Sequence, residues 1–283
     1  MSYANIVTIL SAGADDAIAL ATAAELTHAC GGETRAVLAL GSPEPRYWSF
    51  ITPSALGPAL RDIKTATGAA RRSVEALARE LSLEKELDLE PKSGRIRLIG
   101  EHPSRDIDLH GEFALCDLMV LGFETLDTPS IWNTLIVYGL MEARTPVLIV
   151  AQAPREPTAP AMVAWDGSHQ AGRAVRAALP LLKQSSRLVI FQDPEHLRTA
   201  NRAAADPERL AEYLRLHGVE RSETVILRGA SRGDGLARTA LSEDVGLLVA
   251  GAFGQSRLRE EIFGGLTHAL LASKRVFNLL VCH

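Results

Sequence analysis

The chain has 283 residues, of which 47% are hydrophobic and 23% are charged, and its formal net charge is −4. This composition indicates a folded globular protein, excludes intrinsic disorder, and offers no basic field for nucleic acid or an anionic membrane. The three cysteines are widely spaced, so we expect neither disulfides nor a cysteine-rich metal site. No apolar run comes near the ~18 residues of a transmembrane helix, and the N-terminal region is not basic. We therefore expect a soluble cytoplasmic protein.

The first half of the chain contains five short apolar runs. They predict β-strands at residues 6–10, 37–40, 96–99, 118–121 and 147–150. Residues 152–160 then contain three prolines, which neither a helix nor a central strand accommodates. We therefore predict an interdomain linker at 152–160, between a first domain at residues 1–151 and a second at residues 161–283.

The second half alternates strands and helices. Strands are expected at residues 162–165, 188–191, 224–227, 247–250 and 276–281. Apolar side chains at helical spacing predict a helix at 171–182, which Pro180 ends or bends. Asp206 and Pro207 predict the start of a second helix, which Gly218 ends. Shorter helices are expected at 236–241 and 266–272, and this alternation predicts a parallel sheet covered on both faces.

The two halves repeat the same order of elements. Matched strands are offset by 156, 152, 129 and 131 residues, so the first copy carries about 24 extra residues between its second and fourth strands. The aromatic, proline-bearing stretch 43–58 falls in that interval. The sequence thus predicts two tandem α/β units, each with a mostly parallel five-stranded sheet.

A glycine-rich segment follows the strand at 247–250 and contains Gly251, Gly254, Gly264 and Gly265. Asp166 follows the first strand of the same half, so both features are expected at the carboxyl edge of the sheet, where α/β folds bind ligands. Glycines let the backbone approach a phosphate, a helix N-terminus favours an anion, and a carboxylate accepts hydrogen bonds from ribose. On the residues alone, turn glycines and an aspartate that caps the next helix are an equally good interpretation.

Gly251, Gly254 and Gly264 fit the pattern Gly, two residues, Gly, nine residues, Gly, and the segment 163–168 supplies an acidic residue after a strand. In these motifs residues 161–283 resemble the nucleotide-binding universal stress proteins, especially the tandem-domain members. The resemblance implies a Rossmann-like, adenine-nucleotide α-hydrolase-like fold and a regulatory protein that binds ATP, with Mg²⁺ as its counter-ion. It implies that Asp166 meets the adenosine moiety and that Gly251, Gly254, Gly264 and Gly265 surround ribose and phosphates.

The second half departs from this family at one position. ATP-binding members carry Ser or Thr after the last glycine, where Gly265 stands here, and Thr267 follows two residues later as a substitute hydroxyl. A lost hydrogen bond to phosphate costs about 1.5–3 kcal/mol, or ten- to a hundredfold in affinity.

The first half departs further. Leu10 or Ser11 stands where Asp166 would, and Thr125 and Leu135 replace the second and third glycines after Gly122. We therefore expect at most one nucleotide per chain, with the first domain serving as a pairing partner inside the chain. The resemblance implies that the strand at 147–150 pairs with the strand at 276–281, within one chain or in a homodimer, which also covers two sheet edges.

Two other functions remain open. The segment from Gly229 to Gly233 matches a nucleophile elbow with Ser231, followed by Asp244 and by His268 or His283, which would make an esterase. Alternatively, the domains bind no nucleotide and act through protein contacts. The sequence shows no other nucleophile with a base, no P-loop with a phosphate-binding lysine, and no metal-ligand spacing among its histidines. It therefore favours a binding protein with at most slow ATP hydrolysis over an enzyme.

Overall fold

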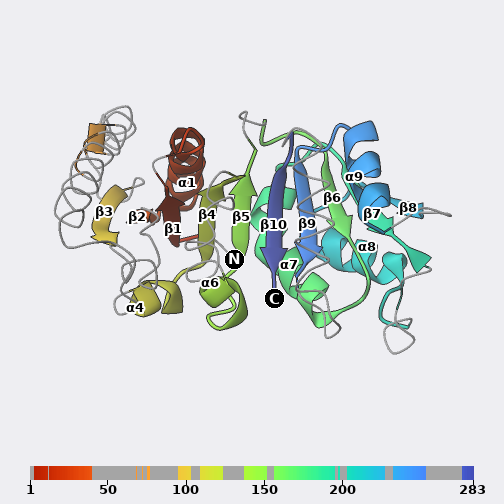
Figure 1. Ribbon diagram of the computed structural model, residues 1–283. Helices are drawn as coiled ribbons and strands as arrows, with labels where there is room; N and C mark the ends of the chain where they lie inside the picture. Colours follow the sequence, from red (N-terminus) through yellow and green to blue (C-terminus); the bar gives the residue numbers. More distant parts are fainter. Residues whose placement is uncertain are drawn as a thin grey trace, which may run out of the picture. The chain divides into compact units, whose positions relative to one another are not determined.

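In a computed structural model the chain is described at residues 3–11, 13–39, 68, 72, 75–76, 95–102, 109–123, 137–151, 156–194, 197, 203–226, 232–252 and 276–283. The chain divides into two compact units, Ser2–Thr145 and Pro146–His283. Each unit combines β-strands with helices, as Figure 1 shows. The two units are described separately below.

The N-terminal unit contains a parallel sheet with the strand order β3-β2-β1-β4. Helix α1 packs on β1 and β4 and buries Ala19, Leu20 and Ala23. It ends at Gly31, which adopts the left-handed conformation (φ 74°) that favours glycine. The elements are β1 (Asn5–Leu10), α1 (Asp16–Cys30), β2 (Glu33–Ala39), β3 (Arg95–His102), α4 (Leu109–Ala114), β4 (Leu118–Gly122) and α6 (Val137–Met141).

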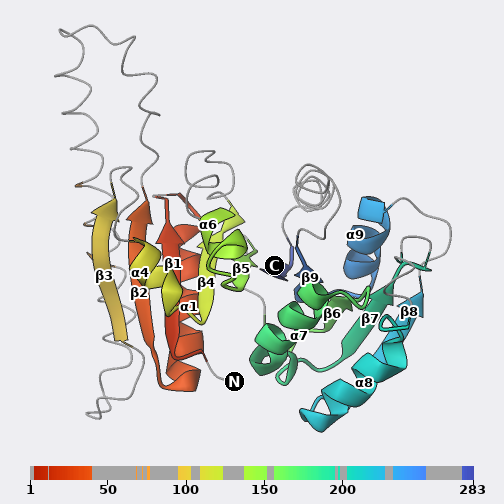
Figure 2. The same cartoon turned by 90° about the horizontal axis from the view of Figure 1, so that it is seen from below.

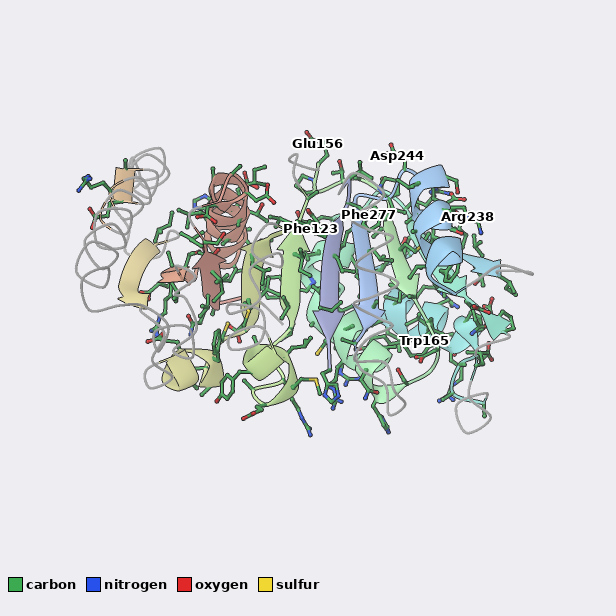
Figure 3. The ribbon with its side chains drawn as sticks, in the orientation of Figure 1. Phe123, Glu156, Trp165, Arg238, Asp244 and Phe277 are labelled. Atoms are coloured by element: carbon green, nitrogen blue, oxygen red, sulfur yellow. The ribbon has the colours of Figure 1, made fainter. Side chains whose placement is uncertain are left out.

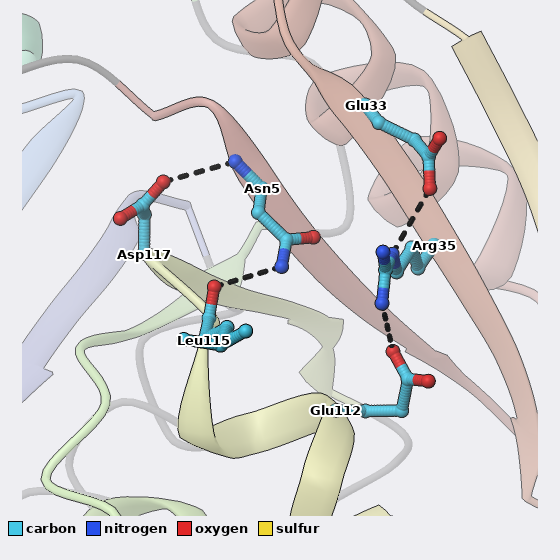
Figure 4. Close-up of polar contacts among 6 residues, drawn as sticks. All are labelled: Asn5, Glu33, Arg35, Glu112, Leu115 and Asp117. Atoms are coloured by element: carbon cyan, nitrogen blue, oxygen red, sulfur yellow. Dashed lines mark hydrogen bonds and ion pairs between the residues drawn. The ribbon is translucent and has the colours of Figure 1, made fainter.

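Polar contacts join the amino ends of β1 and β4 (Figure 4). Asp117 Oδ2 accepts hydrogen bonds from the backbone N–H groups of Ala4 and Asn5, both at 2.9 Å, and Asn5 Nδ2 donates to Leu115 O at 2.7 Å. These bonds hold the two central strands in register at the edge away from their carboxyl ends. They satisfy backbone groups that the strand ladder leaves unpaired.

The C-terminal unit contains a sheet with the order β5-β10-β9-β6-β7-β8. All its neighbours are parallel except β5 and β10, which are antiparallel with Leu148 opposite Leu280. Helices α7 and α8 lie on one face of this sheet and α9 on the other (Figure 2). The elements are β5 (Val147–Val150), β6 (Ala161–Ala164), α7 (His169–Leu182), β7 (Leu188–Gln192), α8 (Pro207–Leu216), β8 (Ser222–Ile226), α9 (Arg232–Ser242), β9 (Leu247–Gly251) and β10 (Asn278–Cys282).

The predicted helix signals in this unit are confirmed. Asp206 Oδ1 accepts from Glu208 N at 3.0 Å, Pro207 begins α8, and Gly218 follows its end with φ 81°. Pro180 lies inside α7, which continues for two further residues to Leu182. Of the two outcomes expected for Pro180, an end of the helix at this residue is therefore wrong.

The predicted alternation and duplication agree with the topology, since β6 to β9 repeat the order of β1 to β4. Apolar runs alone underestimate several elements: β2 begins at Glu33 rather than 37, and α9 at Arg232 rather than 236. In β2 the missed residues include Thr34, buried against Thr27, and Arg35, which pairs with Glu33 and Glu112. The predicted helix at 266–272 and the stretch 43–58 lie outside the described residues.

Candidate functional site

Strands β6 and β9 lie side by side in the C-terminal sheet, with Ala161 opposite Leu247 and Ala164 opposite Ala250. From β6 the chain continues to β7 on one side, whereas from β9 it continues to β10 on the other. The crevice beyond their carboxyl ends is therefore a topological switch point, where open α/β sheets bind ligands. Asp166 and Gly251 both lie at this edge, as expected from the sequence.

The Asp166 side chain takes part in a local turn. Its Oδ1 accepts a hydrogen bond from Ser168 N at 2.9 Å, while Ser168 Oγ caps α7 by accepting from Ala171 N at 3.1 Å. Ser168, not Asp166, is thus the cap of this helix. Asp166 is exposed, so its carboxylate lies at the surface of the switch point.

Gly167 permits a close approach between two loops. Its φ is 70°, which favours glycine, and a Cβ at this position would stand 2.5 Å from Ala205 N. The segment that precedes α8 therefore lies against the turn between β6 and α7. No side chain larger than hydrogen fits there.

Gly251 permits an equally close contact between β9 and the first turn of α7. A Cβ on Gly251 would stand 2.5 Å from Ala171 N and 2.9 Å from the carbonyl carbon of Gln170. The absence of a side chain at Gly251 is thus required by packing, whatever the site binds. The contact brings the helix N-terminus, with its favourable dipole for anions, to the end of β9.

The other predicted site residues lie outside the described residues: Gly254, Gly264, Gly265, Thr267 and, for the esterase alternative, Ser231. Of the residues predicted to bind nucleotide, the structure brings Asp166 and Gly251 to one edge of the sheet. The roles of all six residues remain predictions.

The matching edge of the N-terminal unit has different residues. Ile9 pairs with Leu121, as Ala164 pairs with Ala250, so Ser11 rather than Leu10 stands at the position of Asp166. Asp15 packs directly against the place where a Cβ on Gly122 would stand, and Asp15 and Asp16 are only 4% and 8% exposed.

These two buried carboxylates were missed by the sequence reasoning. Asp16 Oδ1 accepts from Ser11 N at 3.0 Å, so its side chain closes the turn after β1. Two consecutive acids a few residues after a strand were the available signal. The predicted counterparts of the glycines, Thr125 and Leu135, lie outside the described residues.

A cavity of about 380 Å³ lies between the N-terminal halves of α7 and α8. Its polar walls are formed by Arg176 and Arg209, and its aromatic walls by Trp165 (Figure 3) and Tyr213. None of the described residues that line it is acidic. The sequence reasoning did not find this cavity, because its walls come from two helices more than thirty positions apart in sequence. Its lining is Trp165, Gly167, Ser168, His169, Gly172, Val175, Arg176, Ala204, Arg209, Leu210 and Tyr213.

Helix α7, which begins near the carboxyl edge of the C-terminal sheet, carries Arg173 and Arg176 and no acidic residue. Burial raises the pKa of the Cys282 thiol at the end of β10, while Arg173 and Arg176 act in the opposite direction. Within the described ranges no three His, Cys, Asp or Glu side chains gather as a metal site. Over the same part of the chain, no helix has the length and apolar character needed to cross a membrane.

Comparisons with known proteins agree with this architecture. Residues 159–276 match the model of the universal stress protein family. A universal stress protein from Archaeoglobus fulgidus has a similar structure, with a TM-score of 0.65 and 13% identity over 98% of this chain and 95% of that one. A putative universal stress protein from Pseudomonas aeruginosa gives a TM-score of 0.56 at 16% identity, over 99% and 93% of the two chains.

A protein of unknown function from Pseudomonas aeruginosa is similar to the same extent, with a TM-score of 0.54 and 16% identity over 99% of this chain and 92% of that one. A search of curated proteins finds no match. At these identities the structural matches establish the two-domain α/β fold along nearly the whole chain, and the family model supplies the assignment in the second half. Residues 159–276 therefore match the universal stress protein family.

Proposed function

We propose that the C-terminal unit binds one adenine nucleotide, ATP, between the carboxyl ends of β6 and β9, and that the protein is a regulator rather than an enzyme. The observation that carries this proposal is the topological switch point, where exposed Asp166 and the glycine segment beginning at Gly251 share one edge. The Asp166 carboxylate accepts hydrogen bonds from ribose, and the glycines from Gly251 to Gly265 accommodate the phosphates. Mg²⁺ would accompany the phosphates.

The N-terminal unit is proposed not to bind a second nucleotide. Its switch point holds Asp15 and Asp16, both buried, where the C-terminal unit has Gln170 and Ala171 beside Gly251. Bringing phosphate beside two carboxylates costs Coulomb energy, and removing the carboxylates from their packed positions costs more. One nucleotide per chain is therefore expected.

The N-terminal copy is proposed to serve as a pairing partner within the chain. By strand order β5 is the fifth strand of the first copy, and it pairs antiparallel with β10, the fifth strand of the second. The pairing continues past the strand, since Asn278 Oδ1 accepts from Ala151 N at 2.8 Å. It leaves neither of these two strands with an open edge on that side.

Calorimetric titration of the nucleotide-stripped full chain with ATP tests the nucleotide proposal. Asp166→Asn is the sharpest variant, because an amide oxygen still accepts from Ser168 N while the negative charge is lost. Loss of a charge-assisted hydrogen bond predicts about ten- to a hundredfold weaker binding. Glu220→Gln, an exposed carboxylate at the opposite edge of the same sheet, is the matched control and should bind like wild type.

The wild-type stoichiometry is expected to be one per chain. No heat of binding at millimolar ATP would reject the nucleotide proposal and favour a module that acts through protein contacts. Two sites per chain, or Asp166→Asn binding as tightly as Glu220→Gln, would reject the placement of the site.

A further inference from the structure

We propose that the cavity between α7 and α8 is a second ligand site, separate from the nucleotide site, and that it takes a small flat organic anion. The cavity of about 380 Å³ is large enough for a single-ring compound and lies between α7 and α8. Its walls reach two turns along α7, to Arg176, and to Tyr213 on α8. Neither Asp166 nor Gly251 is among the described lining residues, although Trp165 and Gly167 flank Asp166 in the chain.

The charge of the lining determines the sign of the ligand. Arg176 and Arg209 enter from different helices, and no described lining residue is acidic. Arg209 Nη1 donates to Ala203 O at 3.3 Å, which leaves its other N–H groups for a ligand. Guanidinium groups hold carboxylates and phosphates through paired hydrogen bonds, so an anion that contacts both helices is favoured.

The remaining walls determine the shape of the ligand. Val175 and Leu210 are buried, while the rings of Trp165 and Tyr213 border the cavity. Tyr213 is held by stacking with His217, whose ring centroid is 4.5 Å away. Aromatic and aliphatic walls of this kind bind a flat apolar ring by area burial and stacking.

Gly172 gives an independent reason to regard the cavity as a working site. It stands inside α7, where glycine destabilises a helix relative to alanine. Packing does not require it, since a Cβ there would meet only Arg176 Nη1, at an ordinary contact distance of 3.5 Å. What glycine does provide is open space in the cavity and room for the Arg176 guanidinium to fold over the helix.

Phenyl phosphate, benzoate, inorganic phosphate and phenol are the probes for a titration of the full chain. The signal is the indole N–H cross-peak of Trp165 in a ¹⁵N spectrum, assigned by its loss in Trp165→Phe. Phenyl phosphate or benzoate is expected to shift this peak saturably, and the two arms distinguish a phosphate from a carboxylate ligand. Phenol lacks the charge and inorganic phosphate lacks the ring, so each should bind at least tenfold more weakly.

Three variants connect the signal to the cavity. Arg176→Gln and Arg209→Gln should each weaken binding about tenfold or more, whereas Arg215→Gln, on α8 but outside the lining, should leave it unchanged. Gly172→Ala should weaken binding and at the same time raise resistance to urea, a combination that a purely structural glycine would not give.

The proposal is overturned if neither aromatic anion shifts the Trp165 peak at about 10 mM, ten times a millimolar dissociation constant. It is also overturned if ATP competes with phenyl phosphate for that signal, because the cavity would then belong to the nucleotide site. Asp166→Asn should not weaken phenyl phosphate binding, so failure here and failure of the nucleotide proposal are distinguishable.

Discussion

Replacing Gly251 by alanine tests the close packing of α7 against β9. Gly251 is not among the glycines with positive φ, so alanine is allowed by the backbone and the effect is steric. Its Cβ would stand 2.5 Å from Ala171 N, whereas ordinary contacts begin at 3.4 Å. The N-terminus of α7 must therefore move by about 1 Å, in a contact between backbone atoms that have no alternative rotamer.

Overpacking of this kind costs about 1–3 kcal/mol, which exceeds the gain of up to about 1 kcal/mol from removing a glycine from a strand. With a urea dependence of about 2 kcal/mol per molar for a unit of this size, the unfolding midpoint should fall by up to about 1 M. Circular dichroism during urea titration, without nucleotide, measures this shift.

Gly172→Ala is the matched control for Gly251→Ala. It adds the same methyl group to the same unit, but the new Cβ meets only Arg176 Nη1 at 3.5 Å. Better helix propensity should then raise the midpoint, by the equivalent of about 0.5–1 kcal/mol. If Gly251→Ala unfolds at or above the midpoint of Gly172→Ala, the close approach described here is not a feature of the folded protein.

Three further predictions concern single contacts. Ser168→Ala should destabilise the C-terminal unit by about 0.5–2 kcal/mol in urea, whereas Ser168→Asp, which keeps a capping oxygen, should not. Burial raises the pKa of Cys116 to about 12, so the neutral thiol favours the folded state up to pH ~8.5 and that contribution is lost toward pH 12. Stability should therefore fall by up to about 1.4 kcal/mol per pH unit above pH 8.5, and Cys116→Ala, compared by urea titration from pH 8 to 10, should lack this component. Leu148 and Leu280 lie directly opposite each other in β5 and β10, so the double variant Leu148→Cys, Leu280→Cys should form a disulfide in the oxidised monomer, seen on a non-reducing gel. The control variant Leu148→Cys, Leu279→Cys should form none. A disulfide found only in dimers would contradict pairing within the chain.

Much of the secondary structure was predictable because its signals are local. Apolar runs marked all ten strands found in the described part of the chain, and Asp206, Pro207 and Gly218 marked both ends of α8, since caps and turns depend on neighbouring residues only. Boundaries failed where polar residues continue an element. β2 begins four residues earlier than its apolar run because Arg35 is neutralised by two glutamates contributed by its own strand and by α4.

The candidate site was predictable only in part. Placing Asp166 and Gly251 at one edge follows from strand polarity, which the alternation of strands and helices already implies. The use of Ser168 as the cap of α7, with Asp166 in the preceding turn, depends on the path of the chain after β6. So does the position of Asp15 beside Gly122 in the other unit, which neither residue type nor spacing indicates.

By itself, then, the sequence determined the α/β class, the duplication and the glycine pattern, because periodicity, caps and repeats are properties of residues near one another in the chain. Only the tertiary structure decided that β6 lies beside β9, that Gly251 touches the backbone of α7, and that Arg176 and Arg209 line one cavity. Each of these contacts joins residues that are more than thirty positions apart. Such contacts depend on the order of strands in the sheet and on the shapes of the packed side chains, which no local pattern encodes.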